Sequence, residues 1–281
     1  MAIELIHAYL KLEDYIQAEQ QNQETWEKTM VEPYWKILTQ CAPFSEEYKK
    51  PTTHLAKNEA EQQLETLKKV DWDNVLKTFN MVCDALPKID DDVMYIALYP
   101  SNTEMAEGVY GTAVWGNIIL NINARNTDFE KWIPFVFAHE YHHNIWGGYW
   151  YCLHNGDGLR GWFIETILIE GQADAFAQSI FTDMKPSWNS GISSDEENKI
   201  WHIFENVIET CLSLEETGKY MFGCEELGIP PYAGYYSGLK IIREYMNKTQ
   251  TNDMTKILET PLEEIYRFYT NNARSAYYQI S

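Results

Sequence analysis

Residues 134–146 read PFVFAHEYHHNIW, and the order of residue types in this stretch predicts a helix that carries a chemical site. Side chains four residues apart lie one turn apart on the same side of a helix, so His139 and His143 can direct ring nitrogens at one ion. Glu140 is displaced around the helix, close enough to meet a water bound to that ion. The apolar residues 135–138 indicate a core helix, where imidazole and carboxylate groups need a compensating partner.

Residues 139–143 have the HExxH spacing, in which two histidines bind zinc and the glutamate acts as general base. A zinc ion with three protein ligands and one open position lowers the pKa of its water to about 7, and Glu140 can then take the proton. The plainer interpretation is a group of partly exposed histidines on an amphipathic helix. His142 lies off the line of the two ligand histidines, and we interpret it as a residue that lies behind the ligands or faces solvent.

A third ligand has to come from elsewhere in the chain. The longer motif that adds a glycine and a third histidine is absent, because Trp146 and Tyr149 hold those positions. His154 is a candidate, but it lies in a glycine-rich loop. Glu170 is the better candidate, because a helix predicted from about Gly161 to Phe181 can return past the first helix.

Asp174 lies one turn beyond Glu170 on the same face, where a carboxylate can accept the free N–H of a ligand imidazole and fix its orientation. Small residues would let this helix approach another closely: Gly171, Ala173, Ala175 and Ala177. Both acids could instead belong to an ordinary solvated face. Apolar neighbours argue against that interpretation: Ile164, Ile167, Leu168, Ile169 and Phe176.

The motifs together resemble the gluzincin pattern, which is HExxH followed by ExxxD. More narrowly, the chain resembles a bacterial family described as predicted zinc-dependent proteases of otherwise unknown function. Three segments carry this resemblance: AHEYHH at 138–143, IEGQADAFA at 169–177 and GYYSG at 234–238. The resemblance covers about residues 108–245. It implies a zincin-like, thermolysin-like arrangement of the helices and hydrolysis of peptide bonds.

Zinc peptidases also need a group that stabilises the developing oxyanion, often a tyrosine or a histidine. Tyr235 and Tyr236 lie in the GYYSG segment, and Tyr235 is the first choice, although a packing role is an equal alternative for either ring. His154 and His202 are weaker candidates. A strand predicted at 109–114 precedes the metal helix and would bind the substrate backbone by β-addition, or else be an internal strand.

The remaining pattern predicts a mostly helical α+β fold with a small mixed sheet next to the active-site helix. Ile3–Tyr9 is a strand or the start of a helix. Further strands are expected at Val93–Tyr99, Gly108–Val114 and Asn117–Asn123, the last two as a hairpin. Other helices are expected at about 14–40, 58–86, 194–216, 235–246 and 261–271, and Thr127–Glu130 resembles a capping box. We expect one catalytic domain over 1–281, with a division into lobes 1–90 and 91–281 left open.

The formal charge of -20, from 22 basic and 42 acidic residues, repels nucleic-acid phosphates and anionic lipid, so neither is an expected partner. The chain has five cysteines, which is an odd number, and no two of them have the CxxC spacing. Both observations favour reduced thiols, as in a cytoplasmic protein, over a framework of disulfide bonds. Neither a secretory signal nor a membrane span is expected from the sequence. The oligomeric state is left open.

We therefore expect a cytoplasmic zinc peptidase that holds one zinc ion through His139, His143 and Glu170 and acts on a peptide or protein substrate. One alternative is a non-catalytic zinc-binding protein, regulatory or partner-binding, that keeps the fold. The presence of Glu140 speaks against it, since a purely structural site needs no base and more often uses cysteine. Metal-assisted hydrolysis of a non-peptide bond is a third possibility.

Overall fold

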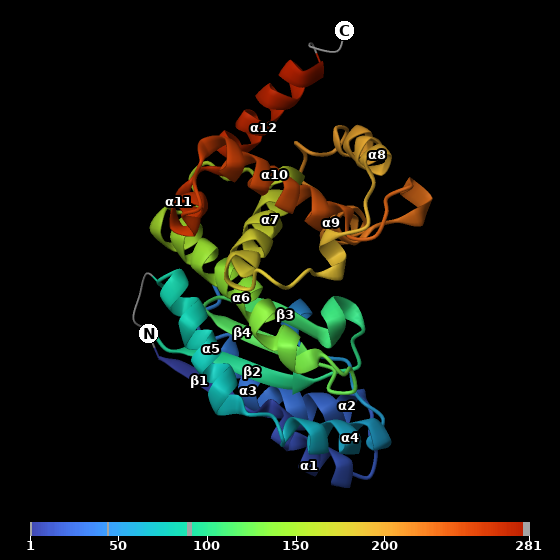
Figure 1. Cartoon of the computed structure of the whole chain (residues 1–281). Coiled ribbons are helices and arrows are strands. Elements are labelled where there is room, and N and C mark those ends of the chain that lie inside the picture. Colours follow the sequence, from blue (N-terminus) through green and yellow to red (C-terminus); the bar gives the residue numbers. More distant parts are fainter. Residues whose placement is uncertain (1, 44, 89–91, 278–281) are drawn as a thin grey trace. The chain divides into compact units, whose positions relative to one another are not determined.

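The computed structural model describes residues 2–43, 45–88 and 92–277 (Figure 1). The chain forms two compact units, Met1–Gly148 (unit 1) and Tyr149–Ser281 (unit 2). The interpretation of the chain as one catalytic domain, with a lobe boundary near residue 90 left open, stays a prediction.

Unit 1 contains a four-stranded mixed sheet in the order β1-β2-β4-β3. The strands are β1 (Ile3–Ile6), β2 (Met94–Pro100), β3 (Val109–Val114) and β4 (Asn117–Ile122). β1 and β4 run parallel to β2, whereas β3 runs antiparallel to β4 and forms one edge of the sheet. The prediction of a mostly helical α+β fold with a small mixed sheet is confirmed.

The predicted hairpin is also confirmed, with a turn of two residues between β3 and β4. Trp115 has a φ of 38° and Gly116 a φ of 90°, which is the left-handed pair that a tight hairpin turn requires. The turn fixes the register, so that Gly111 pairs with Leu120. Successive β3 side chains point to opposite faces of the sheet, so Val109, Gly111 and Ala113 share one face.

The helices of unit 1 are shorter than the apolar pattern predicts. They are α1 (Leu12–Gln17), α2 (Gln23–Trp26), α3 (Glu32–Leu38), α4 (Lys57–Leu67), α5 (Trp72–Ala85) and α6 (Phe129–Gly147). The expected continuous helices at 14–40 and 58–86 are wrong, because capping residues lie inside both. Asn22 accepts from the backbone N–H of Thr25 at 2.9 Å and starts α2, and Asp71 accepts from that of Asn74 at 3.0 Å and starts α5.

Helix α6 begins at Phe129, before Pro134, and continues through it. The proline removes one backbone hydrogen bond without ending the helix. The helix start at Thr127–Glu130 is confirmed, but the capping box is wrong, because Asp128 is the N-cap and its side chain makes no cap hydrogen bond. α5 packs against α6 through stacked rings of Phe79 and Phe137, whose centroids are 3.9 Å apart.

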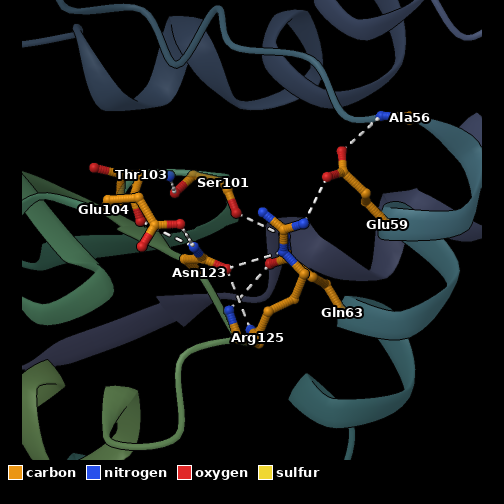
Figure 2. A network of polar contacts seen from close by, with 9 residues as sticks. Ala56, Glu59, Gln63, Ser101, Thr103, Glu104, Asn123 and Arg125 are labelled. Atoms are coloured by element: carbon orange, nitrogen blue, oxygen red, sulfur yellow. Dashed lines mark hydrogen bonds and ion pairs between the residues drawn. The ribbon is translucent and has the colours of Figure 1, made fainter.

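Figure 1 shows α1, α2 and α4 on the side of the sheet opposite to α6. Figure 2 shows how α4 is joined to the carboxyl ends of β2 and β4. The amide of Gln63 donates to the Ser101 carbonyl at 2.6 Å and accepts from the Ala124 N–H at 3.2 Å. An ion pair of 2.6 Å between Arg125 and Glu59 adds a second tie. The sheet thus has fixed helices on both faces, which gives α6 a rigid support.

Unit 2 is helical over its described residues. Its helices are α7 (Phe163–Ile180), α8 (Ser194–Phe204), α9 (Leu214–Phe222), α10 (Ala233–Thr249), α11 (Met254–Glu259) and α12 (Leu262–Tyr277). The single helix expected at 194–216 is wrong, because Ser213 and Glu216 form a capping box that starts α9. No helix in the described part of the chain is long and apolar enough to cross a membrane.

Candidate metal site

The two histidines of the HExxH pattern lie side by side on α6. Their Nε2 atoms are 3.0 Å apart, and the two rings are nearly perpendicular, at 82°. Two nitrogens that bind one tetrahedral zinc at about 2.0–2.1 Å lie roughly 3.3 Å apart, so the pair needs only a small adjustment to hold the ion. The predicted pairing of His139 and His143 on one helix face is therefore present within unit 1.

Glu140 lies against strand β3, and the contact depends on a glycine. A Cβ atom added at Gly111 would lie 2.2 Å from Cγ of Glu140 and 2.7 Å from its Oε1. Ordinary contacts between carbon atoms are about 3.5–4.0 Å, so no other residue type leaves room for this carboxylate. The sequence pattern of α6 does not reveal Gly111, because the two residues are 29 positions apart and meet only through the packing of α6 on β3.

His142 is fully buried, with 0% of its surface exposed. The interpretation that it faces solvent is therefore wrong. Its ring centroid lies 6.2 Å from that of His143, and a position behind the ligand pair stays a prediction.

Glu170 and Asp174 lie on successive turns of α7 in unit 2. Asp174 is fully buried, and its carboxylate accepts from the indole N–H of Trp188 at 3.1 Å and from the amide of Asn189 at 2.8 Å. An ordinary solvated face is therefore excluded for Asp174. Sequence reasoning missed Trp188 and Asn189, whose positions outside α7 give no periodic signal. Glu170 is half-buried.

Helices α7 and α10 approach each other through glycines, as the small residues of α7 predict. A Cβ atom at Gly171 would lie 2.2 Å from the carbonyl carbon of Gly238, and one at Gly238 would lie 2.1 Å from the Ile167 carbonyl oxygen. Gly171 follows Glu170 directly, so this contact fixes the backbone of the proposed third ligand. Tyr235 lies on α10 one turn before the contact.

The other candidates have different surroundings. Tyr235 and Tyr236 are both half-buried, and the ring of Tyr235 packs at 5.5 Å from that of Phe222. His154 is exposed and its ring lies 4.5 Å from that of Tyr149, while His202 is exposed on α8. The roles proposed for all four side chains stay predictions.

Among the residues that the structure describes, His139 and His143 in unit 1 and Glu170 in unit 2 each offer an atom of a type that binds metal ions. Two imidazole nitrogens and one carboxylate oxygen form the donor set of a catalytic zinc site that keeps an open position. The spacing of the histidine pair and the chemistry of the set therefore both suit zinc.

Residues 71–267, well over half of the chain, match the family described as Predicted Zn-dependent protease (DUF2268). The chain belongs to this family. The matched residues include the α6 and α7 motifs and the whole of β2, β3 and β4. The resemblance to predicted zinc-dependent proteases is thus confirmed, and the family description itself is that of a predicted activity.

A relative in Bacillus subtilis (strain 168), Uncharacterized protein YjfC, is 27% identical over 165 residues. The match covers 55% of this chain and 53% of that protein, so it spans about half the length of the relative. No solved structure matches the chain. Membership of the DUF2268 family therefore rests on the match to residues 71–267. The argument for metal chemistry rests on the residue types and geometry of the candidate metal site.

Proposed function

We propose that the chain is a zinc-dependent peptidase in which Glu140 is the general base. The observation that carries the proposal is the histidine pair on α6, whose Nε2 atoms are 3.0 Å apart, together with the neighbouring Glu140. The carboxylate of Glu140 has room against β3 only because residue 111 is a glycine. A structural zinc site would need no such glutamate. The family description points to the same activity.

Glu170 is the proposed third ligand of a single zinc ion. Its support is the carboxylate itself, which with two imidazoles would complete the donor set of a catalytic zinc site, and the close α7–α10 glycine contact that fixes the backbone beside it. Asp174 is proposed to accept the N–H of one ligand imidazole. Hydrogen bonds from Trp188 and Asn189 hold its carboxylate in a fixed orientation, which supports this role.

A zinc ion held by these residues would polarise the scissile carbonyl and lower the pKa of a water to about 7. Glu140 would be the general base beside that site and the group that returns the proton to the leaving amine. The nearly complete burial of Glu140, at 8% exposed, keeps competing water away from the carboxylate. Tyr235, or else Tyr236, is proposed to donate a hydrogen bond to the developing oxyanion.

The substrate is proposed to be a peptide or protein segment that adds as a further strand to β3. β3 is an edge strand of its sheet, and its Gly111 lies directly beside Glu140, so a peptide bound there would pass the general base. The net charge of -20 disfavours nucleic acid and anionic lipid as partners. A cytoplasmic location belongs to the same proposal, supported by five free cysteines.

The experiment combines metal analysis with cleavage of a peptide library by the wild type, Glu140→Gln and Glu130→Gln. Glu130 is an exposed glutamate in the first turn of the same helix and is the matched control. We expect one zinc per chain in all three proteins and cleavage by the wild type and the control only. Cleavage that survives Glu140→Gln would refute Glu140 as the base.

The third ligand is tested separately with Glu170→Ala and His154→Ala. We expect zinc affinity to fall in Glu170→Ala and to stay unchanged in His154→Ala. The opposite result would transfer the ligand role to His154, which is exposed and packs against Tyr149 with its ring tilted by 42°.

A further inference from the structure

One backbone hydrogen bond shows which residues of β3 direct their N–H and C=O groups toward β4 and which direct them toward the free edge of the sheet. The N–H of Asn123 donates to the carbonyl of Gly108 at 2.7 Å, so this pair is a hydrogen-bonded pair of the antiparallel ladder. Such pairs alternate along the strands, and the residues between them direct both backbone groups away from the partner. Val109, Gly111 and Ala113 therefore present their N–H and C=O groups to the free edge of the sheet.

The three outward-facing positions are not equivalent. Gly111 lies beside Glu140, and its carbonyl accepts from the neighbouring Thr112 hydroxyl at 2.8 Å, which leaves a second lone pair for another donor. The carbonyl of Ala113, by contrast, accepts from the ammonium of Lys49 at 3.0 Å. A side chain from a segment 64 positions away thus occupies the edge at this point.

Lys49 is held in place by a charged and largely buried group. Its ammonium pairs with the carboxylate of Glu46 at 2.8 Å, and Glu46 also accepts from the indole N–H of Trp115 at 2.6 Å. Glu46 is only 2% exposed. A buried carboxylate with two charge-assisted or indole contacts makes a fixed anchor, so the ammonium cannot leave the edge without leaving a buried charge unpaired. We call Glu46, Lys49 and Trp115 the edge clamp.

We propose that the edge clamp ends the substrate-binding edge at Ala113, so that a bound peptide pairs with Val109 and Gly111 only and is cut close to one of its termini. The inference rests on the proposed function and adds to it the class of substrate. Gly111 and Ala113 are successive outward-facing positions, so the peptide extends about two residues beyond Gly111 before it meets Lys49. The proposal therefore sets a limit on peptide length on the Ala113 side of Gly111, and the edge clamp sets no limit on the Val109 side.

The test uses synthetic fluorogenic peptides built around the bond that the library identifies, lengthened one residue at a time on either side. We expect wild-type kcat/KM to fall at least about tenfold once one side exceeds about two residues, and to be insensitive to length on the other side. Acetylated and amidated versions of each peptide identify which terminus lies at the clamp. Equal cleavage of peptides extended on both sides would overturn the proposal.

Two variants separate the clamp from general effects. Lys49→Met keeps the aliphatic stem but frees the Ala113 carbonyl, and we expect it to recover most of the loss seen with the long peptides. Lys50→Met is the matched control, because Lys50 pairs with Glu47 and lies over the ring of Trp35. An unchanged length profile in Lys49→Met would also overturn the proposal. If Lys49→Met does not fold, the wild-type profile decides alone.

Failure of the proposed function has a different signature. A wild type that cleaves no peptide of any length, or that cleaves as well after Glu140→Gln, refutes the peptidase mechanism itself. A wild type that needs Glu140 and cuts in the middle of long peptides keeps the peptidase and refutes only the edge clamp.

Discussion

Replacing Gly111 with alanine tests whether strand β3 positions the general base. The added Cβ would lie 2.2 Å from Cγ of Glu140, whereas contacts between carbon atoms are about 3.5–4.0 Å. The Glu140 side chain must therefore retreat by more than about 1 Å. A misplacement of about 1 Å costs on the order of 100-fold in rate, which is about 2.7 kcal/mol of transition-state stabilisation. We expect kcat/KM of Gly111→Ala to fall by about that factor.

The same substitution should have little effect on folding or on the metal. A glutamate side chain can rotate away, and alanine is favoured over glycine in a strand by roughly 0.5–1 kcal/mol, which offsets part of the strain. The three atoms nearest to the added Cβ all belong to Glu140, so zinc binding by His139 and His143 should persist. The assay measures kcat/KM on the best library peptide, zinc content and the thermal unfolding midpoint of each protein.

Gly147→Ala is the matched control, because no atom lies within 4 Å of its added Cβ and its backbone is helical. It should keep wild-type activity. Retention of more than about a third of the activity by Gly111→Ala would refute the positioning role. Loss of zinc together with activity would show that Gly111 acts on the metal ligands instead of on the base.

Two further predictions concern stability. Gly171→Ala places a Cβ 2.2 Å from the backbone of α10, and it should lower the free energy of unfolding, measured in urea, by about 1–3 kcal/mol. Gly218→Ala in α9 is the control, because no atom lies within 4 Å of its added Cβ, and it should not lower the free energy of unfolding. Equal stability of the two variants would contradict the close contact between α7 and α10. Burial lowers the pKa of His7 from 6.5, so the unfolded chain binds the extra proton first and stability is lost as the pH falls below about 6.5. His7→Asn should therefore lose less stability than the wild type between about pH 7.5 and 5.5, and identical pH profiles would exclude this contribution.

The features that could be predicted from the sequence depend only on residues within one helix or one hairpin. Residues four positions apart lie on the same face of any α-helix, so the approach of the His139 and His143 rings could be predicted from their spacing alone. The turn at Gly116 is similarly local. The breaks in the expected long helices were missed because the apolar period continues through capping residues such as Asn22 and Ser213.

The features that could not be predicted depend on which elements pack together. Gly111 looks like any glycine in a strand until α6 is placed on β3 and the carboxylate of Glu140 takes the space of the missing side chain. Asp174 has the right spacing for a role beside the metal, but its partners Trp188 and Asn189 come from a segment with no helical period. Lys49 lies 64 positions from the backbone group that it covers.

These nonlocal contacts act on different parts of the proposed reaction. The motif on α6 supplies the groups that any zinc peptidase needs, and so it identifies a class of chemistry without choosing a substrate. Choice of substrate depends on how much of β3 is open to a peptide, because each further ladder pair adds binding energy of about 0.5–1.5 kcal/mol per hydrogen bond. In the proposed reaction, the edge clamp would remove such a pair on one side of Gly111, whereas the missing side chain of Gly111 leaves the space that the Glu140 carboxylate occupies. On this proposal, one strand would determine both the position of Glu140 and the length of peptide that can reach it.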